Sequence, residues 1–94
     1  MPADDRAERT LQIQNELGLH VRAAGAFVKV SSKFPCEITV VKGDSEINGK
    51  SILSLIQLVA SKGTTIAIRA RGERAEEAVA ALVALIENKF GEGK

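Results

Sequence analysis

The sequence is poor in the residues that support several common classes of site. Only one of its 94 residues is a cysteine, Cys36, which excludes an internal disulfide and a multi-cysteine metal site. Tryptophan and tyrosine are absent, and the three phenylalanines are not interleaved with lysine and arginine as base-stacking platforms would be. The 13 basic and 12 acidic residues are spread along the chain, which argues against a nucleic-acid-binding surface. We expect no nucleic acid, metal ion or other cofactor.

Long apolar runs are also missing. The longest, Ala78 to Ile86, has 9 residues, whereas a helix that crosses a bilayer needs about 20. Residues 1–6 lack the basic region and following apolar stretch of a secretory signal. We therefore predict a cytoplasmic protein that makes no use of a membrane.

The length suits one domain, and its limits follow from where apolar residues begin to recur. Residues 1–9 are polar and show no apolar period, so we predict a flexible N-terminal tail. Alternation begins at Thr10, and the folded domain is expected over 10–90. Residues 91–94 are predicted to be a C-terminal tail, with Gly91 ending the last helix.

Apolar spacing within the domain predicts the order β-α-β-β-α-β-α. Strands are expected at 10–14, 36–42, 45–48 and 64–71. Helices are expected at about 21–33, from Ser51 to a capping Gly63, and at about 74–89. The second helix is predicted to bury the stripe Ile52, Leu55, Ile56 and Val59. One apolar stripe per helix and one apolar face per strand favour an α+β fold, with three helices on one face of an antiparallel sheet.

His20 is the only histidine, and a lone histidine in a small domain is most often an ordinary surface or hydrogen-bonded residue. The position of His20 indicates a further role, because this residue lies between a glycine-containing loop and the first turn of a predicted helix. Unpaired N–H groups and the helix dipole make such a turn suitable for an anion. The same positive end favours neutral imidazole, which is the nucleophilic form. Arg22 adds a cation suited to phosphoryl oxygens, so the pattern indicates phosphoryl transfer.

Four segments in order carry a family resemblance. Residues 15–28, NELGLHVRAAGAFV, resemble the active-site signature of HPr, the histidine phosphocarrier of the bacterial phosphoenolpyruvate-dependent phosphotransferase system. Residues 47–55, INGKSILSL, are similar to the family's regulatory-serine segment. Residues 62–64 and 72–85 are similar to its last strand entry and final helix. The likeness covers about residues 10–90.

The resemblance implies a monomeric, open-faced β-sandwich with sheet order 1-4-2-3 and the role of a stoichiometric carrier rather than an enzyme. By this likeness His20 accepts phosphoryl on Nδ1 from Enzyme I and passes it to IIA domains, in sugar uptake or in a regulatory relay. Arg22 would stabilise the transferring group, and the main chain of Val21, Arg22 and Ala23 would cradle it. The family usually has proline where Ala23 stands; alanine, a strong helix former, fits the same turn.

Two further roles come with the resemblance. Ser51 opens the second predicted helix, where a serine commonly caps free N–H groups. It also matches the serine that HPr kinase phosphorylates in some bacteria. The family's partner-docking face corresponds to Ile52, Leu53, Gln57, Ala24 and Phe27. The alternative is a regulatory binding module that acts through Ser51 or this face without obligatory phosphorylation of His20.

Overall fold

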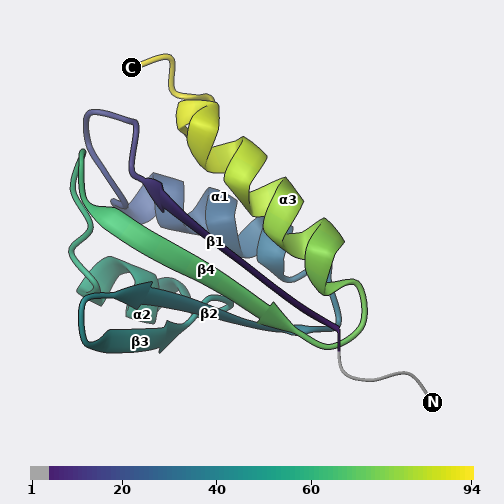
Figure 1. Ribbon diagram of the computed structural model, residues 1–94. Helices are drawn as coiled ribbons and strands as arrows, with labels where there is room; N and C mark the ends of the chain where they lie inside the picture. Colours follow the sequence, from purple (N-terminus) through teal and green to yellow (C-terminus); the bar gives the residue numbers. More distant parts are fainter. Residues whose placement is uncertain (1–4) are drawn as a thin grey trace.

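The computed structural model describes residues 5–94 as a four-stranded sheet covered by three helices (Figure 1). The strands are β1 (Arg6–Gln12), β2 (Glu37–Lys42), β3 (Ser45–Asn48) and β4 (Thr65–Arg71). The helices are α1 (Val21–Ser31), α2 (Ile52–Gln57) and α3 (Ala75–Glu87), followed by the short 3-10 turn Lys89–Gly91. This is the predicted order of elements.

The sheet is antiparallel throughout and has the order β1-β4-β2-β3. This confirms the order 1-4-2-3 that the family resemblance implied. The inner strand β4 pairs with β1 on one side and with β2 on the other. Its side chains alternate as predicted, with Ile66, Ile68 and Ala70 buried between more exposed neighbours. One face of the sheet is therefore apolar and the other polar.

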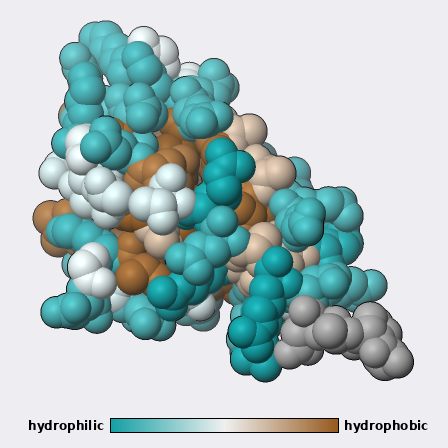
Figure 2. Space-filling model, viewed as in Figure 1, coloured by the Kyte–Doolittle hydropathy of each residue, from teal (hydrophilic) through white to brown (hydrophobic). Residues whose placement is uncertain are grey.

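The helices lie on the apolar face of the sheet and share one core with it. Phe27 of α1, Leu55 of α2 and Leu82 of α3 are completely buried, in one cluster with the inward residues of β2 and β4. In Figure 2 the hydrophobic residues lie mostly toward the middle of the visible face, and hydrophilic residues follow most of its outline. Cys36 is buried in the same core as a free cysteine.

The first strand begins earlier than predicted. Residues 1–4 of the expected tail lie outside the described residues, but residues 6–9 belong to β1 and pair with β4 in register from Arg6–Arg71 to Arg9–Ile68. Main-chain hydrogen bonds at a sheet edge need no apolar alternation, which is why the polar sequence concealed this strand. Glu8 adds an ion pair to Arg69 of β4 at 3.3 Å on the exposed side.

The second helix is shorter than predicted, and its buried stripe was partly wrong. Ile52 is 42% exposed, while Val59 lies beyond the helix, 70% exposed, with a left-handed φ of 54°. The Lys42 ammonium donates to the carbonyl oxygens of Leu58 and Val59 at 3.1 and 2.9 Å, which satisfies the end of the helix. Gly63 therefore does not cap α2 but lies in the turn into β4.

Within residues 5–94, no helix is long and apolar enough to cross a membrane.

Candidate functional site

The loop that carries His20 is fixed at both ends by main-chain hydrogen bonds to the turn before β4. Ile13 N–H donates to Thr64 O at 3.0 Å, and Leu19 N–H donates to Ala60 O at 2.8 Å. The side chains of Ile13 and Leu19 are buried in the core. The residue after Leu19 is therefore held in place before α1 begins.

Gly18 allows the close approach of this loop to the neighbouring turn. Its φ is +67°, and a Cβ at this position would lie 2.5 Å from Ala60 O and 2.8 Å from Ser61 Cα. Both neighbouring atoms belong to the main chain and cannot rotate away. Only glycine fits here without strain.

We expect Gly18→Ala to lower the free energy of unfolding by about 1–3 kcal/mol, because it adds both backbone strain and a collision. Gly25→Ala is the matched control, because Gly25 lies within α1 and a Cβ there would meet nothing within 4 Å. That control should be neutral or stabilising by roughly 0.5–1 kcal/mol. Urea unfolding measures both values, and equal stabilities of the two variants would contradict the packing of Gly18.

His20 lies directly before the first turn of α1, as the sequence predicted, and it is the N-cap of that helix. Its backbone is extended, and its Nδ1 accepts a hydrogen bond from Arg22 N–H at 3.3 Å. The first hydrogen bond of the helix runs from Ala24 N–H to His20 O at 2.8 Å. The N–H groups of Val21 and Ala23 consequently have no acceptor within the helix and remain available to an anion. The imidazole side chain is 25% exposed.

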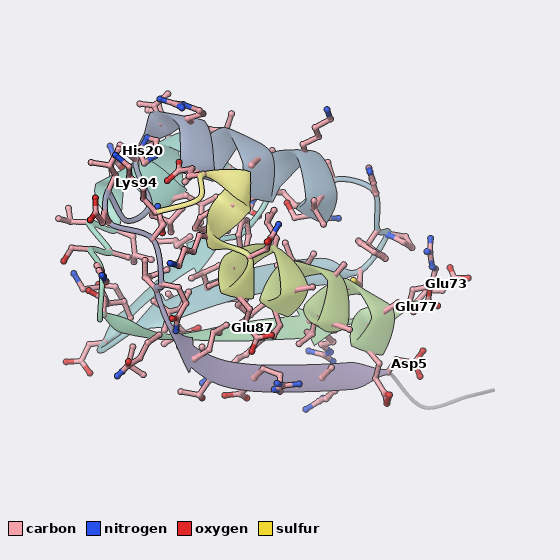
Figure 3. All side chains as sticks on the ribbon, turned by 90° about the horizontal axis from the view of Figure 1, so that it is seen from above. Asp5, His20, Glu73, Glu77, Glu87 and Lys94 are labelled. Atoms are coloured by element: carbon pink, nitrogen blue, oxygen red, sulfur yellow. The ribbon has the colours of Figure 1, made fainter. Side chains whose placement is uncertain are left out.

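The other ring nitrogen of His20 contacts a residue that sequence analysis missed. Nε2 lies 2.5 Å from Oε2 of Glu92, and Oε1 of the same carboxylate accepts from Asn15 Nδ2 at 2.9 Å. The Glu92 side chain is only 13% exposed. The prediction of a tail over 91–94 is thus wrong for Glu92, because these contacts hold it over the site. Figure 3 shows His20 and Lys94 at the same end of the molecule.

The hydrogen bonds indicate that Glu92 is ionised and which nitrogen of the neutral His20 ring carries its proton. Burial alone would raise the pKa of Glu92, but hydrogen bonds from Asn15 and His20, with the charge of Arg22 and that of the His20 ring when it is protonated, lower it below the usual value. An ionised carboxylate accepts hydrogen bonds only, so His20 Nε2 carries a proton toward it. Nδ1, which accepts from Arg22 N–H, keeps its lone pair in the neutral ring and is the nucleophilic atom.

The Arg22 side chain is exposed beside this site and lines one surface depression together with Leu17, Glu92 and Lys94. The charge of Arg22 lowers the pKa of Glu92, which places the guanidinium near the carboxylate that contacts His20. Among the described residues, no group of three or more His, Cys, Asp and Glu side chains could hold a metal ion. The chemistry available here is nucleophilic attack by Nδ1, with main-chain N–H groups and a cation for a negatively charged group.

Ser51 caps α2, as predicted. Its backbone is extended, and its Oγ accepts from Ser54 N–H at 3.2 Å.

We expect Ser51→Ala to lower the free energy of unfolding by about 1 kcal/mol, because one N–H of the first turn loses its acceptor. Ser54→Ala keeps that N–H and serves as the control in thermal or urea unfolding. A loss as large in Ser54→Ala would show that capping is not the cause.

The predicted docking residues fall into two groups. Ile52 and Leu53 are 42% and 62% exposed, and Gln57 is exposed as well. Ala24 and Phe27 have no exposed surface at all. Their assignment to a docking face is therefore wrong: both point from α1 into the core, where helical periodicity places them.

Comparison with known proteins agrees with this fold. The family model described as PTS HPr component phosphorylation site matches residues 7–88. The chain belongs to the HPr family. It is 45% identical to phosphocarrier protein HPr of Neisseria meningitidis serogroup B, over 93% of this chain and 98% of the relative.

Solved HPr structures have the same fold. The structure of HPr-C-His from Thermoanaerobacter tengcongensis has a TM-score of 0.89 at 45% identity and covers 92% of this chain and 97% of that chain. An HPr dimer from the same organism has a TM-score of 0.74 at 45% identity, with coverage of 92% and 99%. This dimer counts against the expectation that the present chain is a monomer.

Proposed function

We propose that this protein is the phosphocarrier of a phosphoenolpyruvate-dependent phosphotransferase system, accepting phosphoryl on His20 from Enzyme I and donating it to IIA domains. The observation that carries the proposal is the arrangement at the start of α1. Nδ1 of His20 lies beside main-chain N–H groups without helical acceptors, and the Arg22 side chain lines a depression together with Glu92, which contacts the same ring. Membership of the HPr family supports the same role.

The course of the transfer depends on which nitrogen of the neutral His20 ring carries the proton. The Nδ1 lone pair attacks phosphorus while the bond from phosphorus to the leaving group on Enzyme I breaks, and the bonding electrons stay with that leaving group. His20 keeps its Nε2 proton and becomes a phosphoimidazolium, so no proton has to leave. The N–H groups of Val21 and Ala23, the Arg22 N–H once it has left the Nδ1 lone pair, and the Arg22 guanidinium are suited to the phosphoryl oxygens. Donation to a IIA domain is the reverse displacement.

A phosphorylation assay tests this function. The protein is incubated with phosphoenolpyruvate and the Enzyme I of the same host, and its intact mass is measured. We expect a gain of one phosphoryl group that survives base and is lost in acid, as a phosphohistidine is. The absence of any gain with an active Enzyme I would contradict the proposal.

The surface of α2 supports two further parts of the proposal. Ile52, Leu53 and Gln57 are exposed on one short helix, and we assign them to partner docking. Ser51 precedes them at the helix N-terminus, where a phosphate would be favoured by the dipole and would add negative charge to the docking surface. We propose that Ser51 is the regulatory site in hosts that have an HPr kinase.

A binding module that never uses His20 is the competing function. It would gain nothing from a partly exposed imidazole and an arginine at the same helix N-terminus, so the joint presence of His20 and Arg22 favours the carrier. The phosphoryl receivers, whether sugar permeases or regulatory proteins, are identified by transfer from the phosphorylated carrier to purified IIA domains.

A further inference from the structure

We propose that Glu92 is a positioning residue: its carboxylate holds the proton of His20 on Nε2 and keeps Nδ1 unprotonated for phosphoryl acceptance. The effect on transfer rests on the proposed function, whereas the effect on the ring proton does not. Glu92 contacts the side of the imidazole away from Nδ1, so it does not compete for the phosphoryl group.

Both oxygens of the Glu92 carboxylate are used. Oε2 faces His20 Nε2 at 2.5 Å, and Oε1 accepts from Asn15 Nδ2 at 2.9 Å. The same Asn15 nitrogen donates to Gly18 O at 2.8 Å, and Asn15 is completely buried. Asn15 therefore uses both protons of its amide, which fixes the direction in which Glu92 is held.

The segment that carries Glu92 is itself attached to the site. Phe90, two residues earlier, is buried in the core at 8% exposure. Glu92 N–H donates to Lys89 O at 2.9 Å, and Glu16 N–H of the His20 loop donates to Lys94 O at 3.1 Å. Figure 3 shows this segment reaching the end of the molecule at which His20 lies. Glu92 is thus anchored on both sides along the chain.

The charges favour the same role. The hydrogen bonds and cations around Glu92 keep it ionised, and an ionised carboxylate stabilises positive charge on the neighbouring ring. Positive charge appears on the imidazole when Nδ1 bonds to phosphorus. A carboxylate on the opposite ring nitrogen both selects the reactive tautomer and offsets that charge, as the buried carboxylate does for histidine in the serine protease triad.

Glu92→Gln is the informative variant, because one amide cannot replace both carboxylate oxygens. With its oxygen toward the Asn15 N–H, glutamine turns its NH₂ toward His20 Nε2. A donor at that position favours the ring tautomer that carries its proton on Nδ1, which blocks the nucleophile. Glu16→Gln is the matched control: Glu16 is exposed, lines the same depression and carries the same charge.

Two measurements test the proposal. Nitrogen-15 NMR of the neutral ring should show the Nε2–H tautomer in the wild-type protein and in Glu16→Gln, and a shift toward Nδ1–H in Glu92→Gln. The rate constant of phosphorylation by Enzyme I should fall about tenfold in Glu92→Gln and stay within twofold in Glu16→Gln. Glu92→Ala, which presents no amide to the ring, should fall between wild type and Glu92→Gln in tautomer population.

Failure of the Glu92 role and failure of the proposed function give different results. An unchanged tautomer or an unchanged rate constant in Glu92→Gln would overturn the role of Glu92, as would an equal fall in Glu16→Gln. If the wild-type protein accepts no phosphoryl at all, the proposed function fails, while the tautomer measurement still decides whether Glu92 holds the ring proton.

Discussion

His20→Ala is expected to accept no phosphoryl from Enzyme I, with a rate at least about a thousandfold below that of the wild-type protein. The substitution removes Nδ1, the nucleophilic atom, but leaves the N–H groups of the first α1 turn and Arg22 in place. Those groups bind and stabilise a transferring phosphoryl and cannot form a covalent bond to it. Time-resolved intact-mass measurement after addition of phosphoenolpyruvate and Enzyme I gives the rate.

This loss has to be separated from a loss of structure. His20 is partly exposed and serves as an N-cap, so its replacement should cost stability on the scale of one cap, about 1 kcal/mol. Ser51→Ala removes the cap of α2 and is the matched control, because it should keep its phosphoryl acceptance. An equal mass gain in wild type and His20→Ala would contradict the role of His20. An acid-stable phosphate in both the wild-type protein and His20→Ala would show that the phosphoryl group is on a hydroxyl, such as that of Ser51.

Phe27→Ala is expected to have the largest effect on stability, lowering the free energy of unfolding by about 3–5 kcal/mol. Phe27 is completely buried and is among the largest fully buried side chains. The substitution takes a phenyl ring out of the core between α1 and its neighbours, where the surrounding elements can close the space only in part. Urea unfolding followed by circular dichroism measures the change.

Leu53→Ala is the control for this substitution, because Leu53 is 62% exposed on α2. Its effect on stability should stay within about 0.5 kcal/mol. A loss below about 1 kcal/mol in Phe27→Ala, together with weakened binding to Enzyme I, would show that Phe27 belongs to the docking face. That result would contradict its burial.

Features that depend on neighbouring residues could be predicted from the sequence. The alternation of Ile66, Ile68 and Ala70 identified β4, because the side-chain period of a strand is a local property. The capping position of Ser51 and the place of His20 directly before the first turn of α1 follow from local rules on helix N-termini, and the structure has both. The strand order came from the family resemblance, since periodicity contains no information on which strands pair.

Features that depend on distant residues could not be predicted in this way. β1 starts at Arg6 because β4 supplies partners for its main chain, and α2 ends early where Lys42 meets its last carbonyls. Glu92 is separated from His20 by 72 positions and lies in a short glycine-rich segment with no period. The sequence contains only one hint of its role, a carboxylate close after the apolar residue Phe90. That hint can be interpreted only when the position of α3 in the fold is known.

The most direct test of the account is to locate the phosphoryl group on the wild-type protein by NMR after labelling with nitrogen-15. The account predicts phosphorus-to-nitrogen coupling at Nδ1 of His20, with Nε2 still protonated. Coupling at Nε2 instead, or a phosphoryl group found only on another side chain, would contradict it.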